Sequence, residues 1–526
     1  MTNPATDLAR AVVTALIEAG VTEVVIAPGS RNAPLSFAAY DAAAAGLLRL
    51  HTRIDERSAG FLALGLTRVG SRAAVVCTSG TAVSNLHPAV LEATHAGVPL
   101  VVVTADRPER LRGTNANQTT DQHGVFGPLV ATVAVSVPGD VAVGHGLLHL
   151  DVHLDEPLLP DDRWHPGPVI VPERPRGPRV SGWGEARLAP GPRTVMVAGD
   201  DAGPPARVLA ERANWPLLAE PTSGSRTGDN ALRCYRLLLD GELGRSIERV
   251  VVCGHPTLSR PVTRLLGRED VEVVAAPAAG VWAERPFRVD AVLESVEVDQ
   301  PGDPAWLDAW RDADRSVARQ LDALLAAEPD LTPHEVAGTV SRAVPPGGLL
   351  FVGASSPIRD LDLMVAKYAV GDRRKVIANR GLSGIDGTIS SAIGAALGRA
   401  HGTRNLALMG DVTFLHDAGS LVLGPDEPRP DLTIVVVNDD GGSIFTMLEQ
   451  GAPEHADRYD KLFGTPHGVD LAALCAATRT PLWKVESLGE LEHALASPNG
   501  GIEVVEVAVR RDNRRDLDAR IRALVP

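Results

Sequence analysis

The sequence predicts an α/β protein of three domains, each a parallel β-sheet covered by helices. At 526 residues, the chain is long enough for three or four domains of about 150 residues each. Apolar strand-like runs alternate with helix-like runs from end to end, a pattern typical of parallel sheets that are buried on both faces. Two changes in composition divide the chain, and they predict domains at residues 1–180, 190–330 and 331–526.

The elements of the first domain follow from its apolar periodicity. Apolar residues recur at helical spacing over residues 8–19, and Gly20 ends that helix. A second helix begins near Pro34, after a Pro-Gly-Ser turn. Because ligands bind at the carboxyl ends of the strands in such sheets, we expect functional residues in the loops after each strand. The predicted strands cover residues 21–26, 73–78 and 100–104.

The other two domains continue the same alternation. Residues 174–192 are rich in Pro, Gly and Arg without clear periodicity, so we expect a linker there. The first and third domains resemble each other in their Gly-, Ser- and Asp-rich loops after strands. Strands are predicted at residues 195–198, 217–219 and 250–253 of the central domain, and at 349–352, 376–378, 406–409, 432–437 and 504–509 of the third.

Composition excludes several classes of protein. No apolar run approaches the roughly 18–20 residues that span a bilayer, and charged residues interrupt the N-terminal apolar stretch as in an amphipathic helix. The formal net charge of −15 shows no basic footprint for nucleic acid. Neither CxxC nor zinc spacing occurs among the cysteines, so we expect a cytoplasmic protein without disulfides or membrane insertion. The cysteines are Cys77, Cys234, Cys253 and Cys475.

Two aspartates follow neighbouring strands of the third domain. Gly410-Asp411 comes directly after the strand at 406–409, and Asn438-Asp439 follows the strand at 432–437, with Gly441 and Gly442 close behind. Magnesium prefers about six oxygen ligands, commonly from one or two carboxylates, a diphosphate and water. Asp411, Asp439 and the Gly441 carbonyl could supply such ligands. The alternatives are a helix N-cap at Asp411 and an ordinary turn at 439–441.

This pairing resembles the cofactor signature of thiamine-diphosphate enzymes, a Gly-Asp-Gly motif followed downstream by Asn-Asn. Val412 stands where the signature has its last glycine, and Asp439 stands where it has its second asparagine. A thiamine enzyme also needs a desolvated carboxylate against the aminopyrimidine ring. Glu56 opens an Ala-, Gly- and Leu-rich helix and is the candidate; the alternative is a helix-start glutamate paired with Arg53 or Arg57.

Seven ordered motifs then identify a more specific resemblance, to the MenD family of menaquinone-pathway succinyl-enolpyruvyl-hydroxycyclohexene-carboxylate synthases. The resemblance runs from the N-terminus to the last strand, and it is densest in the first and third domains. The motifs lie at residues 27–34, 54–57, 78–82, 104–108, 116–118, 379–387 and 441–445.

The resemblance implies a three-domain thiamine-diphosphate fold: a pyrimidine-binding domain, a central domain and a diphosphate-binding domain. It implies that the enzyme uses thiamine diphosphate with Mg²⁺ or Mn²⁺, decarboxylates 2-oxoglutarate and adds the resulting succinyl-semialdehyde carbanion to isochorismate in a Stetter-like 1,4-addition. It also implies that Glu56 of one chain meets the diphosphate-binding domain of another. A homodimer is then the smallest active unit, and a homotetramer is compatible with it.

Both implied substrates are dianions, which favours guanidinium groups in the predicted loops. The resemblance assigns substrate contacts to Ser30, Arg31, Arg107, Asn117, Gln118, Ser355, Arg359 and Arg380, with Ile444, Phe445 and Leu448 walling the chamber. It assigns cofactor contacts to Glu56, Ser383, Gly384, Ile385, Gly410, Asp411, Gly441 and Gly442, with Ile385 as the apolar wedge under the bent cofactor. It assigns the metal to Asp411, Asp439 and Gly441.

Several alternatives stay open at the level of sequence. Each arginine could be a solvated helix end, and Arg260 could face the cleft or lie in a plain loop. His51 and His123 are interpreted as structural residues or residues behind the site. The chain could instead be another thiamine-diphosphate 2-oxo-acid decarboxylase or an acetolactate-type synthase, or a relative that binds ligands without catalysis. The arginines argue against the former, and Glu56 with both aspartates argues against the latter.

Overall fold

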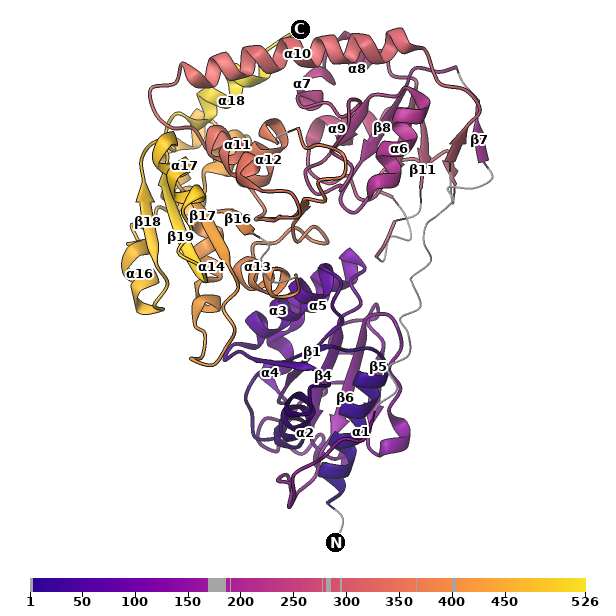
Figure 1. Ribbon diagram of the computed structural model, residues 1–526, viewed down its shortest axis with the longest axis vertical. Coiled ribbons are helices and arrows are strands. Elements are labelled where there is room, and N and C mark those ends of the chain that lie inside the picture. The colour runs from indigo at the N-terminus through magenta and orange to yellow at the C-terminus, as the bar shows by residue number, and fades with distance from the viewer. Residues whose placement is uncertain are drawn as a thin grey trace. The chain divides into compact units, whose positions relative to one another are not determined.

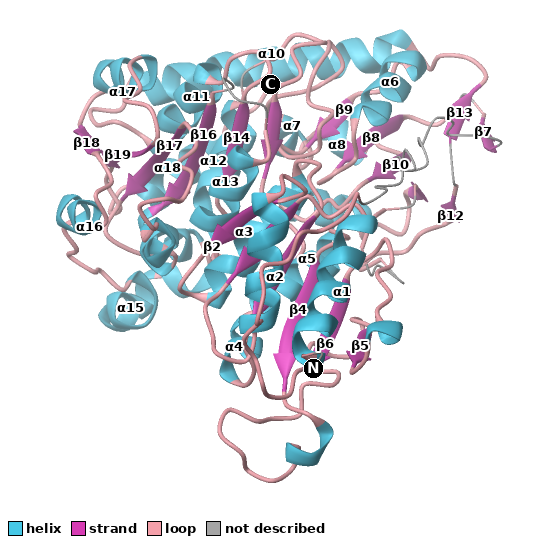
Figure 2. Ribbon diagram, turned by 60° about the horizontal axis from the view of Figure 1, so that its bottom comes forward, coloured by secondary structure: helices cyan, strands magenta, loops and turns pink. Residues whose placement is uncertain are grey.

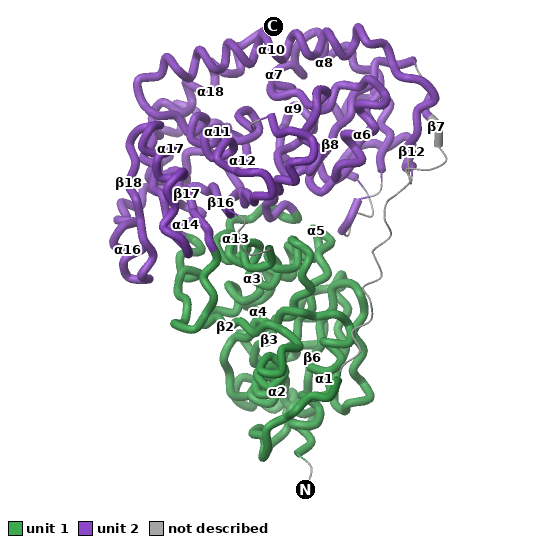
Figure 3. The backbone as a smooth tube through the Cα atoms, in the orientation of Figure 1, with its two compact units in different colours: residues 1–178, 381–401, 416–430 green, residues 179–380, 402–415, 431–526 purple. Residues whose placement is uncertain are grey.

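A computed structural model describes residues 3–168, 186–189, 191–276, 278–280, 285–293, 296–365, 367–399 and 404–526. The chain forms two compact units (Figures 1 and 3). Unit 1 comprises residues 1–178, 381–401 and 416–430, and unit 2 comprises residues 179–380, 402–415 and 431–526.

Unit 1 is built on a six-stranded parallel sheet with strand order β2-β1-β3-β4-β6-β5. Its central strands are buried along their whole length, as the apolar runs predict. Helices lie along the sheet (Figure 2). The strands are β1 (Glu23–Ile26), β2 (Arg49–Thr52), β3 (Ala73–Cys77), β4 (Val101–Asp106), β5 (Thr132–Val135) and β6 (Leu148–His153). The helices are α1 (Pro4–Glu18), α2 (Ala33–Ala44), α3 (Glu56–Arg68), α4 (Thr81–Asn85), α5 (His87–Ala96) and α13 (Thr388–Leu397).

Local sequence explains where these helices begin and end. Asn3 caps α1 by accepting a hydrogen bond from the Thr6 amide, and Gly20 takes a positive φ of 82° just after the helix. Asp55 caps α3 in the same way, through the Arg57 amide. One face of α1 and α2 packs with the sheet into a single apolar core. The first residue of α3, Glu56, is therefore held at a defined helix start.

Helices α3 and α13 pack along each other within unit 1 because glycines and serines line their contact. The Ser390 hydroxyl donates to the Ser58 carbonyl at 2.6 Å, and a Cβ at Gly394 would lie 2.2 Å from the Leu62 carbonyl oxygen. Gly65 approaches the Ser391 carbonyl oxygen as closely, at 2.1 Å. The two helix backbones therefore touch, which no larger side chain at Gly65 or Gly394 would permit.

The central part of unit 2 is a five-stranded parallel sheet of order β12-β11-β10-β8-β9, beside a two-stranded sheet of β7 and β13. The long helix α10 buries Leu307, Trp310, Val317 and Leu321 in the apolar core of this part. The strands are β7 (Ala186–Leu188), β8 (Thr194–Ala198), β9 (Leu217–Ala219), β10 (Arg249–Cys253), β11 (Glu272–Ala275), β12 (Ala291–Val292) and β13 (Val296–Val298). The helices are α6 (Pro204–Ala213), α7 (Tyr235–Leu238), α8 (Glu242–Arg245), α9 (Arg260–Leu266) and α10 (Pro304–Ala326).

The C-terminal part of unit 2 is a second six-stranded parallel sheet, of order β15-β14-β16-β17-β19-β18. If β14 is counted as the first strand of this sheet, its strands follow the same order, 2-1-3-4-6-5, as those of the sheet in unit 1. The predicted likeness of the first and third domains is therefore confirmed. The strands are β14 (Leu349–Val352), β15 (Lys375–Ile377), β16 (Asn405–Gly410), β17 (Leu432–Asn438), β18 (Leu482–Val485) and β19 (Ile502–Ala508). The helices are α11 (Pro333–Ala343), α12 (Ser356–Met364), α14 (Asp411–His416), α15 (Ala456–Tyr459), α16 (Leu471–Ala477), α17 (Leu488–Ala496) and α18 (Arg514–Arg522).

The predicted strands all appear, within two residues of their expected ends. Most of the predicted linker at 174–192 falls on residues 169–185, outside the described residues. The domain boundaries at 1–180, 190–330 and 331–526 stay predictions, although each of the three larger sheets lies within one of these ranges. Among the described residues, no helix has both the length and the apolar character that crossing a membrane requires.

Candidate functional site

Two arginines meet at the carboxyl edge of the sheet in unit 1. Arg31 follows β1 and donates to the Leu154 carbonyl at 3.1 Å. Arg107 follows β4, is 6% exposed, and donates to the Ser79 hydroxyl and to the Gln118 carbonyl. Burial and the nearby charge of Arg31 lower the pKa of Arg107. Arg31 also lies 3.9 Å from the exposed Glu156 carboxylate. Two guanidinium groups this close could bind an anion together, so the role predicted for Arg31 and Arg107 stays a prediction.

The other residues predicted to bind substrate from unit 1 lie on its surface. Ser30, Asn117 and Gln118 are exposed. Gln118 has a positive φ of 55°, and its carbonyl oxygen would lie only 3.2 Å from a Cβ on Gly80. The structure therefore brings Gln118 against Arg107 and the loop after β3.

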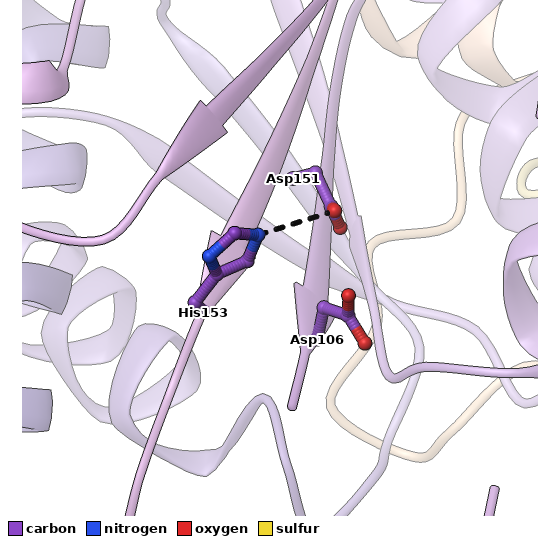
Figure 4. Close-up of side chains that lie close together, drawn as sticks. All are labelled: Asp106, Asp151 and His153. Atoms are coloured by element: carbon purple, nitrogen blue, oxygen red, sulfur yellow. Dashed lines mark ion pairs between the residues drawn. The ribbon is translucent and has the colours of Figure 1, made fainter. Parts of the chain in front are cut away.

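Beneath this edge lies a buried cluster of Asp106, Asp151 and His153 (Figure 4). The two carboxylates are each 1% exposed, and His153 Nε2 is 3.4 Å from Asp151 Oδ2. These donors could hold a metal ion, but the Arg112 guanidinium lies 3.1 Å from Asp106 Oδ2 and also hydrogen-bonds His153. The Arg112 guanidinium is therefore already the cation of this cluster, and a metal ion would have to displace it.

Glu56 lies half-buried at the first turn of α3. Its Oε2 accepts a hydrogen bond from the Asn85 side chain at 3.0 Å. Neither arginine of the alternative interpretation has Glu56 as its described partner: Arg53 pairs with Glu427 at 2.7 Å, and Arg57 donates to the His416 carbonyl at 2.9 Å. The pKa of the buried Cys77 thiol is raised, mainly by burial and next by the nearby charge of Glu56.

The segment that carries Ser383, Gly384 and Ile385 also belongs to unit 1. The Glu92 carboxylate accepts hydrogen bonds from the backbone amides of Gly381 and Leu382 at 2.6 and 2.8 Å. At the start of α13, Asp417 accepts from the Ser390 amide at 2.9 Å, and burial raises the pKa of Asp417 to about 6. Unit 1 therefore holds this segment by carboxylates before and after it, with Ile385 half-buried between them.

Asp411 lies at the carboxyl end of β16, next to β17 in the sheet. It is 2% exposed, and its two oxygens accept backbone hydrogen bonds from Val412 at 2.7 Å and from Gly441 at 2.8 Å. His467 Nε2 is 3.0 Å from Asp411 Oδ2. The predicted adjacency of the two strand ends is confirmed. The hydrogen bond to Gly441 ties together the loops that carry the predicted metal ligands.

Asp439 lies beside Asp411 at the end of β17. Burial and then the charge of Asp411 raise the pKa of Asp439 to about 7, and a hydrogen bond with Ser443 opposes this shift. Two carboxylates this close repel each other when both are ionised, and a divalent cation would remove that cost. The oxygen donors of Asp411, Asp439 and the Gly441 carbonyl therefore fit a hard cation such as Mg²⁺.

The loop after Asp439 is pressed against a second loop of unit 2. A Cβ on Gly441 would lie 2.1 Å from the Gly464 carbonyl oxygen, and φ at Gly441 is 145°. The Phe445 and Phe463 rings lie 5.8 Å apart. Arg515 donates to the carbonyls of Thr446 and Leu448 at 2.6 and 3.3 Å. Half-buried residues of this loop include Gly442, Ile444, Phe445 and Leu448, and their role as a wall of the site stays a prediction.

Ser355, Arg359 and Arg380 lie at the carboxyl ends of β14 and β15. The Arg359 guanidinium donates to the Ser355 carbonyl at 2.6 Å, and burial together with the charges of Arg380 and Arg236 lowers the pKa of Arg359. Arg380 is 4% exposed and donates to the Thr257 hydroxyl at 2.7 Å. The structure thus gathers two of the predicted substrate arginines at one edge of unit 2.

A buried glutamate of the central sheet accompanies Arg380. Glu220 follows β9, is 2% exposed, and accepts a hydrogen bond from the Leu258 amide at 2.9 Å. Burial raises the pKa of Glu220 to about 8, although the charge of Arg380 acts in the opposite direction. Burial therefore favours the protonated form of Glu220 beside Arg380.

Three residues left open by the sequence have clear surroundings. His51 is 2% exposed and contacts Glu23 at 3.0 Å, which supports its structural interpretation. His123 is exposed on the surface. Arg260 forms an exposed ion pair with Glu449 at 2.8 Å.

The sequence motifs did not point to His467, Gln122, Asp151 or Asn85. Each contacts a predicted site residue or its supporting network across a long stretch of chain: His467 and Asp411 are 56 residues apart. No local spacing relates such pairs. Asp151 offered one signal, because a charged residue inside an apolar strand run requires a partner.

Comparisons with known proteins give matches along the whole chain. Residues 6–125 match the thiamine pyrophosphate enzyme, N-terminal TPP binding domain, and residues 361–507 match the corresponding C-terminal TPP binding domain. A protein of Nocardioides sp. named 2-succinyl-5-enolpyruvyl-6-hydroxy-3-cyclohexene-1-carboxylate synthase is 73% identical over 99% of this chain and 98% of its own length. A protein of the same name from Kineococcus radiotolerans is 46% identical over 99% of both chains.

The fold also matches a solved structure, that of benzoylformate decarboxylase from Polynucleobacter necessarius. The TM-score is 0.65 at 18% identity, and the match covers 96% of this chain and 99% of that one. At this identity the likeness shows the fold alone. The full-length sequence matches show more: this chain belongs to the 2-succinyl-5-enolpyruvyl-6-hydroxy-3-cyclohexene-1-carboxylate synthase family of thiamine pyrophosphate enzymes.

Proposed function

We propose that this chain is a thiamine-diphosphate-dependent carboligase of menaquinone biosynthesis. It decarboxylates 2-oxoglutarate and adds the remaining four-carbon unit to isochorismate by 1,4-addition, forming 2-succinyl-5-enolpyruvyl-6-hydroxy-3-cyclohexene-1-carboxylate. The observation that carries this proposal is the pairing of Asp411 and Asp439 at adjacent strand ends, in a chain whose close relatives bear that synthase's name. Bound thiamine diphosphate would supply the carbon nucleophile and the electron sink for decarboxylation.

Residues of this chain would hold the cofactor and shield the reacting carbon. Glu56 would hold a proton at N1′ of the aminopyrimidine ring, and Ile385 would support the cofactor's bent shape. Ser383, Gly384, Gly410, Gly441 and Gly442 would line the cofactor, because glycine and serine allow close approach of the backbone. Ile444, Phe445 and Leu448 would keep water from the reacting carbon.

The substrates would bind through their carboxylates. The close pair of Arg31 and Arg107 in unit 1 and the pair of Arg359 and Arg380 in unit 2 each provide paired guanidinium donors. Ser30, Asn117, Gln118 and Ser355 would add neutral hydrogen bonds. A local cationic edge can attract anions even on a chain with a net charge of −15.

Asp411, Asp439 and the Gly441 carbonyl would hold a divalent metal, Mg²⁺ or Mn²⁺, which would offset the negative charge of a diphosphate. The test is Asp411→Asn, which keeps an acceptor for the Gly441 amide but removes the charge. We expect the metal concentration for half-maximal activity to rise about 10- to 100-fold or more. Asp431→Asn, at the amino end of β17, is the matched control and should titrate as the wild type does. An unchanged titration for Asp411→Asn would exclude this metal site.

The proposed enzyme is a cytoplasmic homodimer, and a homotetramer is compatible with this assignment. Four buried free cysteines support a reducing compartment. Exposed apolar side chains in unit 1, including Phe37, Tyr40 and Ile54, surround a cavity of about 1010 Å³ and support contact with a second copy.

The decisive experiment mixes the purified protein with Mg²⁺, thiamine diphosphate, 2-oxoglutarate and isochorismate. We expect loss of the isochorismate absorbance that depends on every component. A second arm omits isochorismate and measures carbon dioxide, and a third replaces both substrates with pyruvate. Rapid carbon dioxide release in the second arm would indicate a simple decarboxylase, and turnover in the third an acetolactate-type synthase. Inactivity in all three would overturn the proposal.

A further inference from the structure

Residues 112–122 form a surface segment whose two ends reach the same buried carboxylate. This segment, here called the 112–122 loop, carries Asn117 and Gln118 and contains no helix or strand. At its start, the Arg112 guanidinium lies 3.8 Å from Asp151 Oδ2. At its end, the Gln122 side chain donates to Asp151 Oδ1 at 2.8 Å.

Each end is held by more than the bond to Asp151. Gln122 is 1% exposed; its side chain also donates to the Ala105 carbonyl at 3.3 Å, and its Oε1 accepts from the Gly80 amide at 3.1 Å. Arg112 also pairs with Asp106 and hydrogen-bonds His153. The loop is therefore clamped at both ends onto β4 and β6, while its middle lies against Arg107 through the Gln118 carbonyl.

Asp151 is suited to join the two clamps. It lies in the interior of β6, 1% exposed, with one oxygen toward Gln122 and Thr104 and the other toward Arg112 and His153. Figure 4 shows its carboxylate facing His153 across the end of the sheet. Burial alone would raise the pKa of Asp151, but hydrogen bonds with His153 and Gln122 lower it. A buried, ionised carboxylate strongly disfavours any state in which its donors leave.

We propose that Asp151 is a positioning residue that joins both ends of the 112–122 loop and thereby places Asn117 and Gln118 for substrate. The placing of substrate rests on the proposed function, whereas the anchoring of the loop does not. Asp151 itself makes no contact with the reacting atoms in this proposal. It acts through Arg112 and Gln122, so its loss moves the loop but leaves Arg107 in place directly after β4.

The test compares two buried carboxylates of unit 1. Asp151→Asn keeps the shape but removes the charge and can place an amide group where Arg112 already points its hydrogens. Glu23→Gln is the matched control: Glu23 is 1% exposed, pairs with an arginine and a histidine as Asp151 does, and lies at the amino end of β1. Both variants should lose similar stability in thermal unfolding.

Two readouts then separate positioning from stability. In hydrogen exchange, amides of residues 112–122 should exchange about tenfold faster in Asp151→Asn and remain unchanged in Glu23→Gln. In steady-state kinetics, Asp151→Asn should raise the KM of one anionic substrate about 5- to 20-fold, with kcat and the KM of thiamine diphosphate changed less than about threefold. Glu23→Gln should leave all these constants near the wild-type values.

A second pair of variants keeps the test valid if Asp151→Asn does not fold. Arg112 is partly exposed, so Arg112→Met should fold. This variant should raise the KM of the same anionic substrate. Arg112→Lys should bring that KM most of the way back to the wild-type value. Arg112→Met combined with Asp151→Asn should be no worse than the stronger single variant, because both break one connection.

The results against the proposal are equally definite. Unchanged exchange over residues 112–122 in the variants would overturn it, as would an equal rise in KM for Glu23→Gln. If the wild type does not use the proposed substrates, the proposed function fails, yet hydrogen exchange still decides whether Asp151 anchors the loop.

Discussion

Glu56 is the residue on which the proposed chemistry most depends, and its surroundings are simple. It sits at the capped start of α3, with the Asn85 side chain on one oxygen. Nearby Arg53 and Arg57 have other partners among the described residues, the Glu427 carboxylate and the His416 carbonyl. The helix start and Asn85 therefore hold Glu56 in place.

Glu56→Gln tests whether this carboxylate activates the cofactor. The amide keeps the hydrogen bond from Asn85 and the helix start, but it cannot exchange a proton with the aminopyrimidine ring. We expect kcat to fall at least about 100-fold. The melting temperature should not change. Thiamine diphosphate should still bind, although more weakly than to the wild type, and tryptophan fluorescence measures this binding. Asn85→Ala serves as a control that should cost much less. Near-normal turnover in Glu56→Gln would remove this residue from the activating role.

Glu220 gives a second prediction, on pH and stability. Its pKa of about 8 lies above the ordinary value of 4.5, so between these values the native state keeps a proton that the unfolded state releases. Stability is therefore lost as pH rises through this window, by up to about 1 kcal/mol per pH unit. Glu220→Gln removes this loss, so its melting temperature should fall less than that of the wild type between about pH 5 and 8.

Exposed Glu454 provides the comparison for that experiment. Glu454→Gln should follow the wild-type pH dependence, because a solvated carboxylate has nearly the same pKa in both states. Parallel pH curves for the wild type and Glu220→Gln would show that Glu220 is already ionised in the native protein.

At the scale of elements, the contact of α3 with α13 links two predicted parts of the cofactor site. Glu56 opens α3, and Ile385 lies three residues before α13 begins. The two helices touch through glycine and serine, with the Ser390 hydroxyl bonded to the Ser58 carbonyl close to both helix starts. The separation of Glu56 from the Ile385 segment is therefore set by backbone contact.

This contact predicts an inverted response to a common stabilising substitution. Gly→Ala inside a helix usually stabilises by about 0.5–1 kcal/mol. At Gly394 the new Cβ would lie 2.2 Å from the Leu62 carbonyl oxygen, which is backbone and cannot turn away. We expect Gly394→Ala to destabilise unit 1 by about 2 kcal/mol or more, measured by denaturant unfolding.

Gly489 in α17 is the matched position, because a Cβ there would meet nothing within 4 Å. Gly489→Ala should leave stability unchanged or raise it. A stabilising Gly394→Ala would mean that the two helices are farther apart than described.

At the scale of the whole molecule, the chain carries the same six-stranded topology twice. Both sheets present their predicted ligand-binding loops at the carboxyl edge, one with Glu56, Arg31 and Arg107, the other with Asp411 and Asp439. Unit 1 also exposes Ile54 to 74%, two residues before Glu56. A large exposed apolar side chain beside the proposed activating residue is typical of a surface that a partner covers.

The corresponding prediction concerns the oligomeric state. Ile54→Asp should weaken the dimer about 100-fold or more in sedimentation equilibrium, because a charge would be buried at the contact. Activity at low protein concentration should fall with it and recover as the concentration is raised. Val525→Asp, which changes another exposed apolar residue, should remain dimeric. A wild-type chain that is monomeric and fully active would contradict the proposed dimer.

Residues close together in the chain were enough to predict the elements and the loops in which the predicted site residues lie. Buried strands such as β14 and β17 appear where apolar runs predicted them, and Asp411 and Asp439 follow adjacent strands as expected. These features depend on residues close together in the chain, through strand periodicity, capping and turn chemistry. Local sequence therefore suffices to predict them.

The partners of the charged residues became known only from the folded chain. Arg53 pairs with Glu427, 374 residues away, and not with Glu56. Asp151 joins Arg112 and Gln122, and the buried Glu220 keeps its proton near Arg380. Pairing and burial follow from long-range packing, where desolvation and the nearest opposite charge set both geometry and pKa. No spacing along the chain contains that information.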